Sequence, residues 1–308
     1  MAAVGFPRSR ISGPWLPYAA IFLAGLVLDV LCARIPAELP VFMPWEFSWP
    51  VFLGTSLTLF WFFRGLDALP RKARPPLWRC AAFLLGVLSF YAILQTRYDY
   101  LAQHMFFLHR FAHFVLHHAG AFLIALGTAG SVLRAGMPLP INRLIETEAV
   151  KRSVNVIQNP IVAPVLFIGL LYFWLLPQIH TRVMLDRNLY DLMNWTMAID
   201  GVFFWLLILD PRPKPPARLS FLARFLLIIA IELPQMVLGA ILSLSSTDYY
   251  PVYGICGRIM DMTALNDQHY GGLIIWLPGT LMSFAAVIVV LLAVKNHEEE
   301  SERARLAA

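Results

Sequence analysis

Three histidines, His109, His113 and His117, follow one another at intervals of four residues. On an α-helix, with 100° per residue, they lie within about 80° of one another and along about 12 Å of the axis. Neutral imidazole is the commonest metal-ligating side chain, and residues i and i+4 can place two ring nitrogens on one ion. The spacing therefore favours a metal or cofactor site. The alternative is that these histidines hydrogen-bond neighbouring helices.

The remaining histidines occur at positions 104, 118, 180, 269 and 297. His104, His180 and His269 fall toward the same predicted side of the molecule as the stripe, whereas His118 lies slightly deeper and His297 is in the C-terminal tail. If the helix already extends to His104, that side chain points away from the stripe. His104 and His269 still count as candidate ligands because of the side on which they lie.

A second group of candidate ligands precedes the last apolar stretch. Cys256, Met260 and Met262 occur within seven residues of one another, and Asp267 and His269 follow them. Because thiolate and thioether sulfur favour Cu(I), we expect Met260, Asp267 and His269 to support a copper site. The alternative for methionine is apolar packing.

Two acidic residues interrupt otherwise apolar stretches. Asp200 and Glu232 stand far from other charges in sequence, and Pro234 and Gln235 lie two and three residues after Glu232. An ionisable side chain inside a membrane is costly, so it is a functional candidate by default. The alternative is a packing pair with Arg110, with Asn194 or with a hydroxyl.

Membrane-spanning helices are the elements that must position these groups. Only 14% of the residues are charged and 59% are hydrophobic, whereas a soluble domain carries about 25% charged residues. One soluble core cannot bury so many apolar side chains, and disordered chains have the opposite composition. These proportions exclude a soluble enzyme and a disordered chain, and they leave lipid as the solvent for most of the protein.

A spanning helix needs about 20 mostly apolar residues, and eight stretches meet this need. They cover residues 15–33, 47–66, 77–96, 104–130, 156–179, 190–209, 221–245 and 270–294. We therefore predict an all-α fold, a polytopic membrane helix bundle of about eight transmembrane helices that forms a single transmembrane domain, residues 1–308. The mixed charges from Lys295 to Arg305 indicate a solvated extension of the last helix.

Lysine and arginine are distributed unevenly between the two sides of the predicted bundle. With both termini cytoplasmic, 18 of the 24 basic residues lie on the inner side, as the positive-inside rule requires. The outer side holds Arg34, Arg97, Arg110, Arg182, Arg187 and Arg258. This distribution explains the net charge of +5 without a nucleic-acid partner. It also places the histidine stripe at the outer face.

Several catalytic motifs are missing from the sequence. The chain has no phosphate-binding loop of the Walker type, no His-Glu-x-x-His helix, no Gly-x-Ser-x-Gly turn and no Cys-x-x-Cys-His segment. The sequence therefore gives no indication of an ATP-driven pump, a hydrolase or a c-type cytochrome, and we expect no enzymatic activity.

Two stretches carry a resemblance to a known family. In residues 98–127, His109 and His113 precede a long apolar run and follow Asp99 and His104; residues 267–276 read Asp-Gln-His-Tyr-Gly-Gly-Leu-Ile-Ile-Trp. From about residue 95 to its end, the chain resembles the CtaG-type (caa-type) cytochrome c oxidase assembly factors of bacteria.

The resemblance implies an inner-membrane protein that helps to build haem-copper oxidase, with oxidase subunits or other assembly factors as partners and copper handled at the outer face. The residues that carry over are His109, His113, Asp267, Gln268, Gly271, Gly272 and Trp276. The chain departs from the pattern at Tyr190 and Asn194, near which many members have histidine, and at Ala121, where many have proline.

The second motif also has a purely structural explanation. Gly271 and Gly272 let a neighbouring helix approach closely, and Asp267 is placed to cap a helix that begins just after it. We therefore predict an assembly factor that binds copper transiently, with His109 and His113 as first ligands and His117 and His104 next. The alternatives are a copper transporter that uses Asp200 and Glu232, a membrane cytochrome with haem b on its histidines, and a metal-free scaffold.

Overall fold

The computed structural model describes residues 15–255 and 257–307, and these residues form helices and connecting turns without a β-strand. The α-helices are α1 (Trp15–Arg34), α2 (Trp49–Ala68), α3 (Leu77–Leu94), α4 (Arg97–His104), α5 (Phe106–Phe114), α6 (Gly120–Leu126), α7 (Gly130–Gly136), α8 (Leu139–Ile145), α9 (Glu148–Ile157), α10 (Val162–Leu175), α11 (Pro177–Leu185), α12 (Arg187–Ile208), α13 (Phe221–Leu244) and α14 (Ala264–Leu306). A π-helical turn, Val115–Ala119, joins α5 to α6, and 3-10 turns occur at Pro36–Glu38, Arg71–Ala73 and Pro251–Gly254. The predicted all-α membrane bundle is confirmed.

Within the described residues, five helices are long and apolar enough to cross a membrane: α1, α3, α12, α13 and α14. The number rises to seven if α5–α6 with α7, and α9 with α10, each form one bent span. The predicted segment 47–66 is helical, as α2, but it is not among those seven. The total of eight and the side of the termini therefore stay predictions.

Two predicted spans are wrong in their continuity. The segment 104–130 is interrupted at Met105, whose backbone is extended, and α7 is bent by 76° from α5–α6 after Thr128, which has a φ of 46°. The segment 156–179 combines the end of α9 with α10 and the start of α11, and α9 and α10 meet at 70°. Proline explains the second case, because residues before Pro160 and Pro177 are disfavoured in helical conformation.

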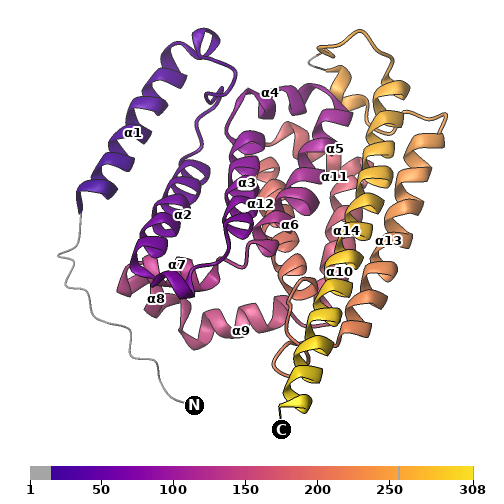
Figure 1. Cartoon of the computed structure of the whole chain (residues 1–308). Coiled ribbons are helices and arrows are strands. Elements are labelled where there is room, and N and C mark those ends of the chain that lie inside the picture. Colours follow the sequence, from indigo (N-terminus) through magenta and orange to yellow (C-terminus); the bar gives the residue numbers. More distant parts are fainter. Residues whose placement is uncertain (1–14, 256, 308) are drawn as a thin grey trace.

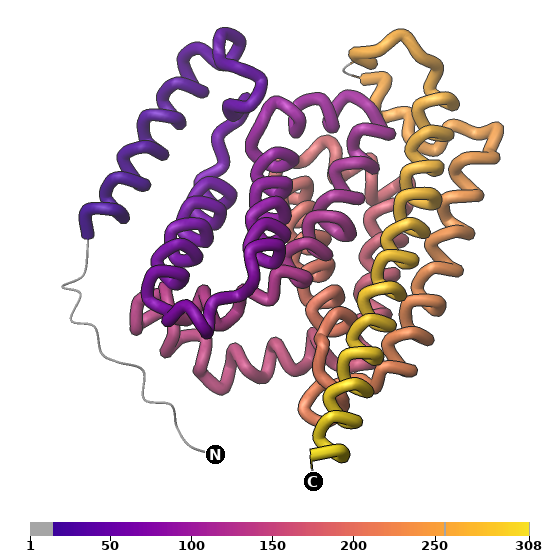
Figure 2. Tube along the Cα trace, viewed as in Figure 1, coloured from indigo at the N-terminus to yellow at the C-terminus, as the bar shows by residue number. Residues whose placement is uncertain are grey.

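The helices form a bundle with α1 and α2 along one flank and the paired helices α13 and α14 along the other (Figures 1 and 2). Helices α3, α5, α6, α10 and α12 lie between the flanks. The short helix α4 covers one end of the bundle, and α8 and α9 cover the other. We call the second end the basic end, because the α2–α3 connection, α8, α9 and the α12–α13 connection carry most of the exposed Lys and Arg residues.

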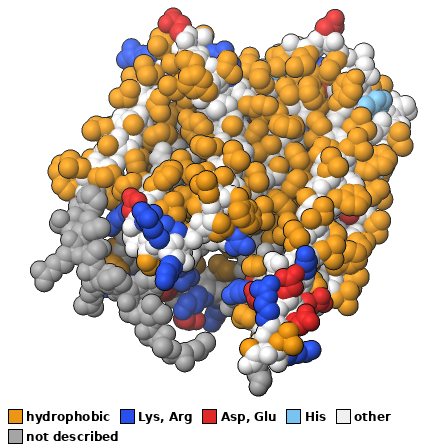
Figure 3. Space-filling view, viewed as in Figure 1, with side chains coloured by type: hydrophobic (Ala, Val, Ile, Leu, Met, Phe, Trp, Pro, Cys, Tyr) orange, Lys and Arg blue, Asp and Glu red, His pale blue; other side chains and the backbone are white. Residues whose placement is uncertain are grey.

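Apolar side chains dominate the outer surface along the flanks, whereas charged side chains gather at the basic end (Figure 3). Leu85 on α3, Val165 on α10 and Leu281 on α14 are each more than half exposed. In water such an apolar surface would promote aggregation, whereas it is favourable in contact with lipid. The charged C-terminal part of α14 continues the last helix, as predicted.

Close packing between α14 and α5 sets the position of the histidine-bearing helix. A Cβ on Gly271 would lie 2.3 Å from the ring of Phe106, and one on Gly272 would lie 2.5 Å from Ser243 Oγ of α13. Both glycines therefore stand where α14 touches a neighbour. The carboxylate of Asp267 accepts hydrogen bonds from the backbone N–H groups of Phe106 (3.0 Å) and Phe107 (2.9 Å).

Asp267 thus caps the N-terminus of α5 rather than that of its own helix. Met105, at the N-cap position of α5, provides no side-chain hydrogen bond, whereas Thr263 caps α14 by accepting from Asn266. A capping carboxylate satisfies amide groups that a helix leaves free and lies at the positive end of its dipole. Arg258, 3.1 Å away, balances the charge of this fully buried carboxylate.

Candidate metal centre

His109 and His113 lie one turn apart on α5, and both are buried. Their Nε2 atoms are 3.2 Å apart, with the rings nearly perpendicular. With metal–nitrogen bonds of about 2.0–2.1 Å, two nitrogens on one tetrahedral ion stand about 3.3 Å apart. The pair therefore has the spacing of two ligands of one ion, and the same spacing also allows one N–H···N hydrogen bond.

His180 of α11 joins this pair through the hydroxyl of Tyr253. Tyr253 Oη lies 2.7 Å from His109 Nδ1 and 3.0 Å from His180 Nε2, and His180 Nδ1 lies 3.0 Å from the carbonyl oxygen of Trp174. Since a carbonyl only accepts, a neutral His180 carries its proton on Nδ1 and accepts from Tyr253 through Nε2. Tyr253 Oη then accepts from His109 Nδ1–H, which leaves His109 Nε2 unprotonated.

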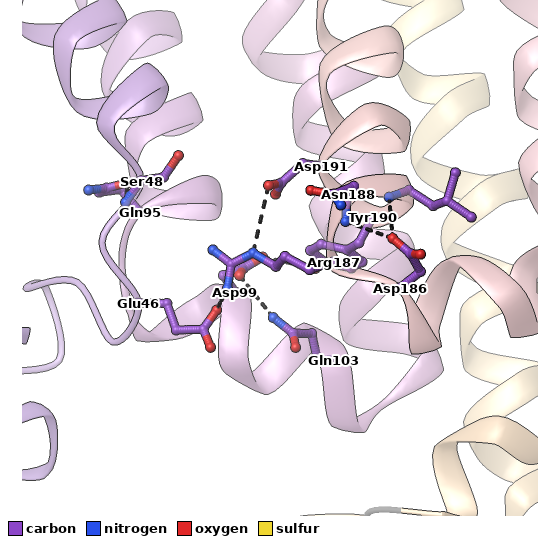
Figure 4. Close-up of polar contacts among 11 residues, drawn as sticks. Glu46, Ser48, Gln95, Asp99, Gln103, Asp186, Arg187, Asn188, Tyr190 and Asp191 are labelled. Carbon is purple, nitrogen blue, oxygen red and sulfur yellow. Dashed lines mark hydrogen bonds and ion pairs between the residues drawn. The ribbon is translucent and has the colours of Figure 1, made fainter. Parts of the chain in front are cut away.

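The hydrogen bonds continue from His113 to α12. Its Nε2 lies 3.1 Å from Asn194 Oδ1, so its proton is shared between Asn194 and His109. One turn earlier on α12, Tyr190 donates to the Asp99 carboxylate of α4 at 2.8 Å, and Gln103 donates to the same group at 3.0 Å (Figure 4). A polar layer thus extends from the histidine pair to the end of the bundle opposite the basic end.

Burial raises the pKa of Asp99 from its usual 3.8 to about 7, although the hydrogen bonds from Tyr190 and Gln103 act in the opposite direction. Burial also raises the pKa of Tyr253 well above its usual 10, so this phenol stays protonated at neutral pH. The hydroxyl of Tyr253, next to the His109–His113 pair, therefore carries no charge and both donates and accepts a hydrogen bond.

His117 departs from the predicted stripe because it lies in the π-helical turn Val115–Ala119. A π turn holds more residues than an α turn, so the residues that follow it are rotated about the axis. The ring of His117 stacks on Phe167 of α10 at 3.8 Å, and its Nε2 lies 3.1 Å from Asp200 Oδ2 of α12. Its carbonyl accepts from Trp205 Nε1 at 3.0 Å. Asp200 therefore pairs with His117, away from the His109–His113 pair.

The second acidic residue inside the bundle has a local partner on the adjacent helix. The carboxylate of Glu232 on α13 accepts hydrogen bonds from the hydroxyls of Thr280 and Ser283 on α14. These contacts join the two helices of one flank. They correspond to the packing alternative considered for Glu232, and none of them links it to a histidine.

The other predicted ligands are directed elsewhere. His104 lies in α4 and bonds the carbonyl of Tyr100 at 2.8 Å, while His269 bonds the carbonyl of Ser245 at 2.8 Å. Met260 is 45% exposed in the loop before α14, and Cys256 lies outside the described residues. In residues 15–255 and 257–307, no three His, Cys, Asp or Glu side chains form a group that could hold a metal ion.

The two remaining residues of the second motif stabilise the α13–α14 region. Gln268 accepts from the backbone N–H of Tyr249 at 2.8 Å and donates to the carbonyl of Thr247 at 3.0 Å. The Cβ of Trp276 would lie 2.8 Å from a Cβ added at Gly239, so it packs at the crossing of the two helices. Neither side chain reaches the histidine pair through a hydrogen bond.

Sequence reasoning missed three groups beside the pair. His180 shares the predicted side of the stripe but is not among the predicted ligands, Asn194 enters as a departure from the family pattern and as a packing partner for the buried acids, and Tyr253 is not singled out. The available signal was position: Asn194 lies inside a predicted span and His180 directly follows one, and polar residues in a membrane usually bond another helix.

A family model matches most of the chain. The model for the cytochrome c oxidase caa3 assembly factor (Caa3_CtaG) matches residues 60–296, a range that contains the histidine pair, His180 and Tyr253. No curated protein and no solved structure matches the chain.

Proposed function

Because the chain belongs to the cytochrome c oxidase caa3 assembly factor family, we propose that it holds copper transiently for a haem-copper oxidase, with His109 and His113 as the ligands. The 3.2 Å separation of the two Nε2 atoms is the observation that supports this proposal most directly. The protein acts in the bacterial inner membrane, with the histidine pair toward the outer face, and it has no catalytic turnover of its own. Its partners are oxidase subunits or other assembly factors.

The surroundings of the pair suit a ligand that enters and leaves. His109 Nε2 already carries a lone pair, since Tyr253 and His180 hold the proton on Nδ1. His113 presents a second lone pair when its proton moves from Nε2 to Nδ1, which has no partner among the described residues. Two ligands leave open positions, unlike a closed structural site, so the ion remains exchangeable.

Two further side chains that could ligate copper lie beside the hydroxyl of Tyr253. His180 Nε2 and Met184 Sδ are 3.0 Å and 3.7 Å from its hydroxyl. Imidazole and thioether groups both suit copper, and thioether sulfur favours Cu(I). A rotation of the phenol away from the pair would let one of them complete the site. We therefore place His180 ahead of the other predicted ligands, which are bonded to other groups or exposed: His117, His104, His269, Met260 and Asp267.

Anaerobic Cu(I) titration against a chromogenic chelator tests this proposal. We expect one Cu(I) per chain in the wild type and at least tenfold weaker binding in the His109→Ala/His113→Ala variant. His269→Ala is the matched control, because this histidine bonds only a loop carbonyl. Undiminished binding by the double variant would refute the site. Normal oxidase activity in cells that carry the double variant would instead favour the metal-free scaffold.

A copper transporter is the second candidate, because His117, four residues beyond His113, pairs with Asp200 of α12, and His113 and His117 both line one cavity. Copper uptake into proteoliposomes, abolished by Asp200→Asn, would favour transport over delivery at one face. We do not propose haem binding. The cavity beside the histidines measures ≈ 20 Å³, whereas pockets for cofactors are of order 300 Å³ or more.

A further inference from the structure

Arg110 follows His109 on α5, and its guanidinium has no counter-charge among the described residues. The residue is 2% exposed, and Nε, Nη1 and Nη2 all lack a hydrogen-bond partner. The other fully buried arginine, Arg224, differs sharply, because it donates to the backbone carbonyls of Asp210, Arg212 and Leu219. A buried, unpaired cation is strongly unfavourable, so Arg110 calls for a partner.

The phenolic hydroxyls and the carboxylate near Arg110 are already engaged, and Gln235 Oε1, which lacks a partner and lines the same cavity, is a neutral acceptor that brings no charge. The hydroxyl of Tyr190 donates to Asp99, that of Tyr250 donates to the carbonyl of Leu175, and that of Tyr253 lies between two histidines. The carboxylate at the start of α5, Asp267, is balanced by Arg258. The ring of Phe106 lies 5.2 Å from the guanidinium carbon and offers a cation–π contact, but it accepts no N–H bond comparable to that of a charged partner.

A cavity of ≈ 20 Å³ adjoins the guanidinium, and it is lined by α5, the π-helical turn, α10, α12, α13 and α14. His113, His117, His118 and Gln235 contribute polar groups to its wall, and apolar side chains form the rest. A cavity needs roughly 10–15 Å³ to hold one water molecule, so this one accepts a particle of about that size. Phosphate, sulfate and carboxylate ions are too large for it.

We propose that this cavity binds a monatomic anion of the halide class, chloride in the cell, with Arg110 as its principal ligand. A water molecule would satisfy N–H donors but would leave the charge uncompensated, whereas an anion does both. A cation in the same place would be repelled by the guanidinium. The Nδ1 atoms of His113, His117 and His118 lack partners, and the ring of His118 makes no hydrogen bond among the described residues, so its Nδ1–H tautomer is a further donor.

Equilibrium binding of radioactive chloride to the purified full-length protein in nanodiscs tests the proposal. We expect saturable binding of one chloride per chain, competition by bromide, and no competition by gluconate, which is too large. Thermal unfolding at constant ionic strength should shift upward when chloride replaces gluconate, because a ligand of the folded state stabilises it. A folded wild-type protein that binds no chloride would overturn the proposal and would leave water as the occupant.

Variants assign the site to Arg110. Arg110→Gln should weaken chloride binding at least tenfold. Arg110→Lys and Arg224→Lys are matched conservative changes, and only Arg110→Lys should weaken chloride binding. Unchanged chloride binding in both Arg110 variants would overturn the assignment to Arg110. If neither variant folds, the measurement on the wild-type protein alone tests the proposal. The His109→Ala variant removes a copper ligand but no residue of the cavity wall, so it should bind chloride whether or not the copper proposal holds, and the two ideas fail separately.

Discussion

One hydroxyl determines which nitrogen of His109 is available to a ligand. Tyr253 accepts from His109 Nδ1–H and donates to His180 Nε2, so it fixes the tautomer in which His109 Nε2 carries a lone pair. We predict that Tyr253→Phe weakens Cu(I) binding by about 10- to 100-fold, as loss of a group that orients a metal-bound histidine usually does. The chelator titration measures this effect.

Tyr250→Phe is the control for that change. Its hydroxyl donates to the carbonyl of Leu175 and has no hydrogen bond to a histidine. The variant should therefore bind copper as the wild type does. Equal losses in both variants would show that packing, rather than the tautomer, limits binding.

Asp99 gives the protein a pH-dependent stability. Burial raises its pKa from 3.8 to about 7 in the folded protein, so the unfolded chain loses this proton first. The free energy of unfolding should fall as pH rises from about 4 to about 7 and then level off. Asp99→Asn should remove this slope, because the amide oxygen still accepts from Tyr190. Thermal unfolding of both proteins from pH 5 to 8 checks this, and parallel curves would contradict it.

The sequence was sufficient to predict that His109 and His113 share a face, because four residues separate them on one helix. It could not place His117, since the π-helical turn depends on contacts with α12, among them the bond from Trp205 to the His117 carbonyl. His180 and Tyr253 lie 71 and 144 residues beyond His109. Only the packed fold brings them to the pair, so spacing alone could not find them.

At the scale of the helices, the contact between α5 and α14 places the histidine pair. A Cβ at position 271 would lie 2.3 Å from the Phe106 ring, so Gly271→Ala must push the two helices apart. We predict a loss of roughly 1–3 kcal/mol in stability, typical of overpacking, together with weaker Cu(I) binding. Thermal unfolding and the chelator titration measure the two effects.

Gly169→Ala on α10 is the matched control, because a Cβ there meets nothing within 4 Å. This change should be neutral or stabilise the helix by up to about 1 kcal/mol. The Gly271→Ala/Phe106→Leu variant should recover part of the loss. If Phe106→Leu restores none of the stability lost in Gly271→Ala, the close contact between position 271 and the Phe106 ring is not the cause of that loss.

Hydropathy predicted the helices with long apolar runs and failed where the chain bends. Helices α1, α12 and α13 begin and end within three residues of their predicted limits. The run from 104 to 130 looked continuous because its composition stays apolar through the bend near Thr128. Apolar composition reports contact with lipid and core, whereas direction depends on single backbone angles and on prolines such as Pro160.

At the scale of the whole molecule, the basic end should face the cytoplasm. Lys151 on α9 lies at that end, and Glu38 lies in the turn after α1 at the opposite end; both are exposed. In a Cys256→Ser background, where Cys32 and Cys80 are buried, a membrane-impermeant maleimide should label Glu38→Cys in intact cells. It should label Lys151→Cys only after permeabilisation. The reverse pattern would put the histidine pair on the inner side.

Copper and chloride should bind cooperatively, because His113 belongs to both proposed sites. A copper ion adds positive charge beside the buried Arg110, and an anion in the adjoining cavity offsets that repulsion. Coupling between two sites is reciprocal, so each ligand should raise the affinity for the other by the same factor.

Chloride itself forms complexes with Cu(I) in solution, so the measurement is best made from the anion side. We predict that one equivalent of copper raises the affinity of the wild-type protein for radioactive chloride by roughly fivefold or more. Copper should have no such effect in the His109→Ala variant, which keeps Arg110 and every side chain that lines the cavity. Equal chloride affinity with and without copper in the wild type would mean that the guanidinium and the metal site act independently. In that case the anion in the cavity would neutralise Arg110 and stabilise the fold without affecting copper binding.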